Sequence, residues 1–383
     1  MDGSASGEGY DPLSLENFWE FTREKNEATF WKLAWSPDNS MVAATFFDNT
    51  CTVLHAKNGS VVKELDLNDP SGGTRCDGFS PEGAKPLRAC AFSPDGEYLA
   101  VGGDDLKITI FNVTTWNIHH VFIGHTGSIL CLDFSPNGEF LASGSGTDKV
   151  IPQNAGENVT RIWNIETRQQ ELTLRGHRDG VLGVKWSHSG NAITTVSDDR
   201  SVRVWSFPSG DEIMNFTGHT SGVLDVDWSE DDSRLITGSR DYKIRVWNIT
   251  SKSHMVTWSD NNCVRSVDFH PLSDIVATSG VDLTLKIRDS ETGIPLRVLK
   301  DGIAQTAMVM CSKWSGDGNY LASGLGKSHT IIMYSFGNEV EDDDNDQWID
   351  AGTRTIVIMV VISTVFLYML YDPAFRKIRK LRR

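Results

Sequence analysis

Short segments of this chain alternate between apolar and polar positions, and turn-forming residues separate them. Leu182, Val184 and Trp186, for example, alternate with Gly183 and Lys185. Successive side chains of an extended strand point to opposite faces, so a period of two predicts β-strands. Sequences such as Ser-Pro-Asp-Gly and Pro-Ser-Gly lie between the segments and predict tight turns. The pattern therefore indicates an all-β chain of many short strands.

One long pattern recurs along the chain. It consists of a Gly-His pair, an aromatic residue ten positions after that Gly, and an Asp six positions before a closing Trp. The aromatic residue opens a Ser-Pro-Asp-Gly-like turn, and it is found at Trp35, Phe92, Phe134, Trp186, Trp228, Phe269 and Trp314. Their spacings are 57, 42, 52, 42, 41 and 45 residues. Such a period predicts one four-stranded propeller blade per copy. One blade cannot bury both of its faces, so the seven copies predict a closed ring.

These motifs resemble those of the WD-repeat family of β-propellers, and the resemblance covers about residues 15–336. The Gly-His motif ends at His125, His177 and His219. The closing aromatic residues are Trp163, Trp205 and Trp247, with Phe111 and Tyr334 as substitutes. The motif's Asp is found at Asp48, Asp105, Asp199, Asp241 and Asp282, whereas Glu157 and Ser328 replace it in the third and seventh copies. The resemblance implies a seven-bladed β-propeller with four-stranded antiparallel blades.

The resemblance also implies a structural role for the repeated polar residues. Within each blade the His, Asp, a Ser hydroxyl and the Trp are expected to satisfy one another, with Ser197 and Ser239 as the hydroxyls of the fourth and fifth blades. His177, Asp199 and Trp205 could be mistaken for a catalytic set. A set repeated in several blades cannot mark one active site, so we expect no catalytic residue and no enzymatic activity.

The ends of the repeat region predict how the ring closes. The last copy ends at Phe336 and lacks an outer fourth strand, whereas Leu15–Arg23 precedes the first copy and contains strand-like aromatic residues. We expect this N-terminal segment to pair with the seventh blade, because closure protects a bare sheet edge. Residues 1–14 are expected to be a flexible N-terminus.

Two kinds of surface are candidates for binding partners. The loops Asp69–Pro86 and Gly146–Val159 exceed what the β-scaffold needs, and they are either contact surfaces or tolerated insertions. The narrower face of a propeller offers turn residues as a second candidate surface. The candidate partner-binding residues there are Arg178, Asp179, Arg200, Arg240 and Tyr242.

Charge and motif content exclude several functions. The net charge is −15, which disfavours binding to nucleic acid because phosphates repel an acidic body. The six cysteines have no metal-ligand spacing and are expected to be reduced, buried thiols. The Gly-Lys-Ser of Ser323–Thr330 lacks the upstream Gly of a phosphate-binding loop, where Leu321 stands instead. We therefore expect no cofactor, no metal and no nucleic acid.

The C-terminal region has a different composition. Residues 337–354 form an acidic linker that includes Glu339–Asp346. Thr355–Tyr371 contains no charged residue, and as a helix it would span about 25 Å, close to the thickness of a bilayer core. A buried helix is the alternative, but a complete propeller has no core left to receive it. We expect a transmembrane helix at 355–371, followed by a short basic tail at 372–383.

Together these features predict a membrane-tethered scaffold or adaptor that presents its propeller to cytosolic proteins. Residues 355–371 would contact membrane lipid, and the arrangement resembles tail-anchored proteins. The short span and basic tail favour the outer mitochondrial membrane slightly over the endoplasmic reticulum. An alternative function is guanine-nucleotide exchange on a small GTPase at the endoplasmic reticulum, because the known exchange factor of coat assembly has a similar architecture. A third is a substrate adaptor for ubiquitin ligases, for which no recruitment motif is visible.

Overall fold

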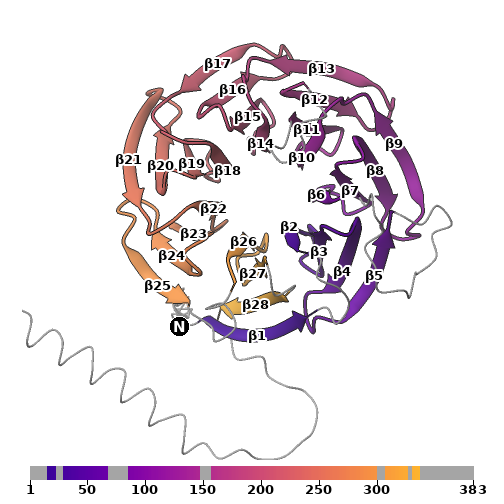
Figure 1. Ribbon diagram of the computed structural model, residues 1–383, viewed down its shortest axis with the longest axis horizontal. Helices are drawn as coiled ribbons and strands as arrows, with labels where there is room; N and C mark the ends of the chain where they lie inside the picture. The colour runs from indigo at the N-terminus through magenta and orange to yellow at the C-terminus, as the bar shows by residue number, and fades with distance from the viewer. Residues whose placement is uncertain are drawn as a thin grey trace, which may run out of the picture. The chain divides into compact units, whose positions relative to one another are not determined.

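Seven four-stranded sheets make up the ring in Figure 1. The computed structural model describes residues 15–22, 29–67, 85–146, 157–299, 307–326 and 330–336. All strand pairs within the sheets are antiparallel, and the first strand of each blade lies nearest the centre of the ring. The predicted seven-bladed all-β propeller is confirmed.

The first four blades follow one another in the chain. Blade 1 contains β2 (Phe30–Trp35), β3 (Met41–Phe46), β4 (Thr50–His55) and β5 (Val61–Asp66). Blade 2 contains β6 (Leu87–Phe92), β7 (Tyr98–Gly103), β8 (Lys107–Asn112) and β9 (Ile118–Ile123). Blade 3 contains β10 (Ser128–Phe134), β11 (Phe140–Gly146), β12 (Val159–Asn164) and β13 (Gln170–Arg175). Blade 4 contains β14 (Val181–Trp186), β15 (Ala192–Ser197), β16 (Val202–Ser206) and β17 (Glu212–Phe216).

The last three blades include the closing one. Blade 5 contains β18 (Val223–Trp228), β19 (Arg234–Ser239), β20 (Lys243–Asn248) and β21 (Ser253–Ser259). Blade 6 contains β22 (Val264–Phe269), β23 (Ile275–Gly280), β24 (Leu285–Asp289) and β25 (Pro295–Leu299). Blade 7 contains β26 (Val309–Trp314), β27 (Tyr320–Leu325), β28 (Thr330–Phe336) and β1 (Leu15–Thr22).

The ring has two faces, which the strand registers define. Each inner strand ends at an anchor aromatic residue and runs into a turn that begins with a Ser in six blades, such as Ser93 after Phe92, and with His270 in blade 6. We call this side the Ser-turn face. In that turn the Ser93 hydroxyl donates to Asp95 at 2.5 Å, and Gly96 has a φ of 74°, which favours glycine. The turns that contain the motif's Asp lie at the opposite end of the strands, on what we call the Asp-turn face.

Every inner strand contains one irregular position near the Asp-turn face. The pairing between the first and second strands skips one residue in each of the seven blades. These seven bulge residues are Trp31, Arg88, Leu130, Leu182, Leu224, Arg265 and Met310. A bulge interrupts the alternation of a strand and redirects the side chain of the extra residue. The bulge residues therefore form a ring of equivalent positions near one mouth of the central channel.

The N-terminal segment closes the ring as predicted. β1 pairs antiparallel with β28, from Leu15 opposite Phe336 to Thr22 opposite Thr330, and it lies outside β28 in Figure 1. Trp19 of β1 donates its indole N–H to the carbonyl of Ala56 at 2.6 Å. Ala56 belongs to blade 1, so β1 completes blade 7 and also attaches it to its neighbour.

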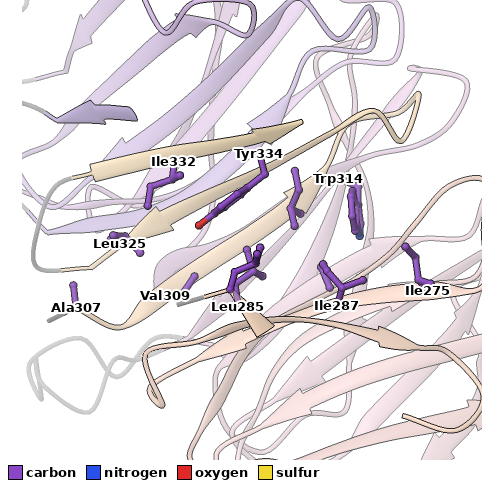
Figure 2. Close-up of a cluster of buried hydrophobic side chains, with 12 residues drawn as sticks. Ile275, Leu285, Ile287, Ala307, Val309, Trp314, Leu325, Ile332 and Tyr334 are labelled. Atoms are coloured by element: carbon purple, nitrogen blue, oxygen red, sulfur yellow. The ribbon is translucent and has the colours of Figure 1, made fainter. Parts of the chain in front are cut away.

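The hydrophobic core is divided among the contacts between neighbouring blades. Figure 2 shows one such cluster, in which Leu285 and Ile287 of blade 6 lie near Val309, Trp314 and Tyr334 of blade 7. All five side chains are at most 5% exposed. Each blade buries its apolar faces only against its neighbours, which is why the sequence repeats the unit.

The chain divides into two units, Met1–Gly337 and Asn338–Arg383, and the described ranges all belong to the first. Within those ranges, the structure has no helix with the length and hydropathy that a membrane crossing requires. The predicted span Thr355–Tyr371, the acidic linker, the basic tail and residues 1–14 lie outside the described residues.

Candidate interaction face

A continuous hydrogen-bonded chain crosses blade 4 below the Asp-turn face. His177 Nδ1 lies 3.0 Å from Asp199 Oδ2, and His177 Nε2 lies 2.8 Å from Thr195 Oγ1. The Trp205 indole N–H donates to the same Thr195 hydroxyl at 2.8 Å. The Trp can only donate and the carboxylate can only accept. The Thr hydroxyl therefore donates to Nε2, and Nδ1–H donates to Asp199.

Blade 5 repeats this arrangement. His219 lies 2.9 Å from Asp241 and 2.9 Å from Thr237, and Trp247 donates to Thr237 at 3.0 Å. Asp241 also accepts the backbone N–H groups of Thr220 and Lys243 at 2.9 and 3.0 Å. The side chains of His219 and Asp241 are 0% and 3% exposed. Hydrogen bonds that outweigh burial lower the pKa of Asp241 to about 2, so the carboxylate stays ionised.

The hydroxyls of these two networks differ from the predicted ones, and the prediction of Ser197 and Ser239 was wrong. Thr195 lies two residues from Ile193, which pairs with Trp205, whereas Ser197 lies another two residues along the strand. Ser197 therefore accepts the backbone N–H of Asp199 at 3.0 Å and donates to the carbonyl of Asp179 at 2.9 Å. Ser239 likewise accepts the backbone N–H of Asp241 at 3.1 Å. The Ser residues hold the turn, and the Thr residues bridge the His and the Trp.

Blade 3 has only part of the network. Ser143 bridges His125 and Trp163, with both distances at 2.7 Å. Glu157, which replaces the Asp, pairs with Arg161 instead of His125. Within the described residues, Nδ1 of His125 has no hydrogen-bond partner. Burial, with a smaller contribution from the Arg161 charge, lowers the pKa of His125 to about 3, so it is neutral at physiological pH.

The motif's Asp has a role that five blades share. In each, a carboxylate oxygen accepts the backbone N–H two residues later, which closes the turn. The donors are Thr50, Lys107, Ser201, Lys243 and Thr284, at 2.9–3.2 Å. Among the described residues, Asp105 and Asp282 bond to no His, and Asp282 also pairs with Lys286 at 2.5 Å. Closing the turn is therefore the common function, and bonding to His is an addition in blades 4 and 5.

Asp241→Ala is expected to destabilise the protein by about 2–4 kcal/mol, because His219 and two backbone N–H groups would lose a buried acceptor. Asp105→Ala is the matched control, since Asp105 closes the same kind of turn without a His. We expect it to cost about 0.5–1 kcal/mol. Urea unfolding of both variants measures the difference, and equal losses would contradict the role assigned to the His bond.

Four of the five candidate partner-binding residues border one hollow between blades 4 and 5. It has a volume of about 450 Å3, and its lining includes Arg178, Asp179, Arg200 and Arg240. Tyr242 is 48% exposed but does not line it. Arg240 pairs with Asp198. Within the described part of the chain, the side chains of Arg178 and Arg200 form no ion pair, so both remain available to a ligand.

The backbone at these turns is constrained. The residue after each turn Asp has a positive φ, at Asn49 (67°), Leu106 (65°), Arg200 (74°), Tyr242 (66°) and Leu283 (65°). Four of these are neither Gly nor Asn, so the conformation is unfavourable by itself and the carboxylate bonds maintain it. The consequence is that the turns present their side chains in fixed positions on the Asp-turn face.

Charged side chains that the sequence reasoning missed line the central cavity, whose volume is about 320 Å3. Lys313 lies 2.7 Å from Asp268 and 3.6 Å from Asp225, and Lys32 reaches Asp225 at 3.2 Å. Lys185 lies 3.6 Å from Asp133. The sequence does contain a signal for them, because the residue directly before the anchor aromatic is charged in several otherwise apolar strands. These residues are Asp133, Lys185, Asp227, Asp268 and Lys313. The pairs Lys313–Asp268 and Lys185–Asp133 join neighbouring blades, and Lys32–Asp225 joins blades 1 and 5 across the channel.

Within the described residues, no group of three potential metal ligands comes together in the cavity. Its carboxylates instead stabilise the backbone of the next blade. Asp133 accepts the N–H of Trp186, Asp227 that of Phe269, and Asp268 that of Trp314, at 2.7–2.8 Å. Burial raises the pKa of Asp268 to about 6, and the neighbouring Asp227 adds to the effect.

Comparison with known proteins gives matches along most of the ring. The family described as "WD domain, G-beta repeat" matches residues 78–112, 116–151, 168–206, 210–248, 252–289 and 293–335. The family described as "Anaphase-promoting complex subunit 4 WD40 domain" matches residues 12–76. Coronin-7 of Bos taurus is 30% identical over 156 residues, which is 37% of this chain and 15% of Coronin-7. Apoptotic protease-activating factor 1 of Mus musculus is 24% identical over 175 residues, or 43% of this chain and 12% of that protein. The chain thus corresponds to a small part of each relative.

Proposed function

Because the chain belongs to the WD-repeat family of β-propellers, we propose that it is a non-catalytic protein–protein interaction scaffold, tethered to a membrane through residues 355–371. The observation that supports this best is the hollow bordered by Arg178 and Arg200, whose side chains form no ion pair with any described residue. Proteins of this fold serve many functions, so the argument depends on this surface and not on the fold. The two longer loops are further candidate contact surfaces, although residues 68–84 and 147–156 lie outside the described ranges.

The last described strand ends on the face opposite the hollow. Ser335 of β28 pairs with Tyr320, which directly follows the Ser315 turn. Phe336 therefore lies at the Ser-turn face, and the hollow lies on the opposite face.

The membrane assignment depends on composition. Thr355–Tyr371 is uncharged, and Lys and Arg residues follow it. We infer that the propeller lies in the cytosol and that the outer mitochondrial membrane is favoured over the endoplasmic reticulum. A scaffold fixed at one membrane raises the effective concentration of its partners there, since the second contact becomes intramolecular.

Imaging and proximity labelling of the tagged full chain test the proposal. We expect colocalisation with an organelle marker and labelling of cytosolic proteins. The Arg178→Gln, Arg200→Gln double variant should reduce that labelling, whereas Arg168→Gln, on the exposed turn between β12 and β13, should not. A diffuse distribution would contradict the tether, and labelling no greater than that of an inert tethered protein would contradict the scaffold. Accelerated nucleotide release from a small GTPase would favour the exchange-factor alternative.

A further inference from the structure

Three of the bulge residues meet at the mouth of the channel on the Asp-turn face. The Arg88 guanidinium lies 5.0 Å from the centre of the Trp31 ring, and that of Arg265 lies 5.3 Å from it. Trp31 belongs to blade 1 and Arg265 to blade 6, so blade 7 separates them along the ring. Their contact therefore passes blade 7 and joins blades 1 and 6 at the mouth.

Arg88 is fully engaged with the protein. Its Nε and Nη2 donate to the two carboxylate oxygens of Asp104 at 2.5 and 3.0 Å, and its guanidinium also lies 5.1 Å from the Phe47 ring. Only 3% of Arg88 is exposed. This bidentate pair neutralises its charge, so Arg88 holds the Trp31 ring and is not available to a ligand.

Arg265 has no such partner. Within the described residues it forms no hydrogen bond and no ion pair, and its guanidinium lies against the face of Trp31. Burial lowers the pKa of Arg265, the nearby Arg240 charge lowers it further, and Cys263 opposes the shift. Arg265 is half-buried, and withdrawing a cation from water without a counter-ion costs stability. A guanidinium at the channel mouth that no described carboxylate pairs with points to a ligand that supplies the missing charge.

The other side of the ring of bulge residues is apolar. Leu130, Leu182 and Leu224 occupy the equivalent positions in blades 3, 4 and 5, and Met310 does so in blade 7. Leu130 is buried, whereas Leu182 and Leu224 are half-buried. The mouth therefore combines one free guanidinium and one aromatic face with an arc of aliphatic side chains. A complementary ligand carries a single negative charge next to apolar groups.

We propose that this mouth binds an acidic side chain within an extended apolar segment of a partner protein, with its carboxylate on Arg265. The inference rests on the proposed scaffold function and names its partner class. One free guanidinium matches one carboxylate, whereas a doubly charged phosphate needs further cations and Arg88 is already paired. Because the protein as a whole has a net charge of −15, an acidic partner is attracted at this local cationic site and repelled by most of the remaining surface.

Peptide binding to the full chain in mild detergent tests the proposal. Three pools of otherwise randomised peptides carry a central Glu, Gln or phosphoserine. We expect the Glu pool to be retained about tenfold more than the Gln pool, with the difference shrinking at high salt. Arg265→Gln should abolish the difference, and Arg168→Gln should preserve it. Equal retention of the Glu and Gln pools, preference for phosphoserine, or an Arg265→Gln variant that still prefers Glu would each overturn the proposal.

A stability readout separates ligand binding from a structural role. Because Arg265 lacks a counter-ion, Arg265→Gln should unfold at the same temperature as the wild type or a higher one. A variant that unfolds at a clearly lower temperature would show a structural role and overturn the proposal. Arg265→Lys keeps the charge but loses the planar fork, and it should retain part of the preference for Glu. Wild-type labelling of cytosolic proteins without any Glu preference would reject the mouth site and leave the scaffold standing, whereas absent labelling would reject the scaffold itself.

Discussion

A chain that begins at residue 26 is expected to lose the folded ring. Deleting residues 1–25 removes β1, so β28 would expose an unpaired edge and blade 7 would keep three strands. Phe18, Trp19 and Phe21 would leave a hydrophobic cluster that includes Phe30 and Met333. Losing one large aromatic side chain costs about 3–5 kcal/mol, and a whole domain is stable by only about 5–15 kcal/mol. Circular dichroism melting and size-exclusion chromatography should show aggregates without a cooperative transition.

A shorter deletion serves as the matched control. Removing residues 1–14 leaves β1 intact and should give the same melting temperature and elution volume as the full chain. Trp19→Ala should fall between the two, because it removes the bond to Ala56 and the packing against Gly59 but keeps the strand pairing. A cooperatively folding monomer that begins at residue 26 would show that the ring does not depend on β1.

The parts of the fold that the sequence predicts are those encoded by local patterns. Each anchor aromatic residue, such as Trp186, ends an inner strand and opens a turn, so every blade can be counted without knowing its neighbours. The unpaired edge of the last copy predicted β1 in the same way, because a missing fourth strand is visible in the order of segments. The repeated His, Asp and Trp positions also lie in one register, which made His177, Asp199 and Trp205 recognisable as a set.

Exact registers within a strand and contacts between blades were not predictable in this way. The choice of Thr195 over Ser197 depends on a distance of two residues along one strand, and both side chains suit the role chemically. The pairing of Lys32 with Asp225 joins blades 1 and 5, which are 193 positions apart in the chain. The contact of Arg265 with Trp31 needs both a bulge and the curvature of the ring. A repeat pattern describes one blade at a time and therefore omits such contacts.

Those contacts across the channel also give the second large effect, which we expect from Lys313→Met. Lys313 donates to Asp268 at 2.7 Å and to the carbonyl of Val267 at 3.2 Å, and it lies 3.6 Å from Asp225. Although burial opposes it, Asp225, Asp268 and Asp227 raise the pKa of Lys313 well above its ordinary value. Removing one partner of a buried ion pair leaves uncompensated charge and costs about 3–5 kcal/mol. Urea unfolding at about pH 7.5 should show this loss.

The loss should shrink in mild acid, which distinguishes stranded carboxylates from a simple packing defect. Asp268 already has a pKa of about 6, and removing the Lys313 charge raises it further. A carboxylate with a raised folded-state pKa stabilises the fold below its unfolded pKa, and it loses this contribution as the pH rises through the folded value. Lys313→Met should therefore recover part of its stability at about pH 5.5. Lys57→Met, at an exposed turn, should change nothing at either pH. A loss that is identical at both pH values would mean that packing, and not charge, explains the role of Lys313.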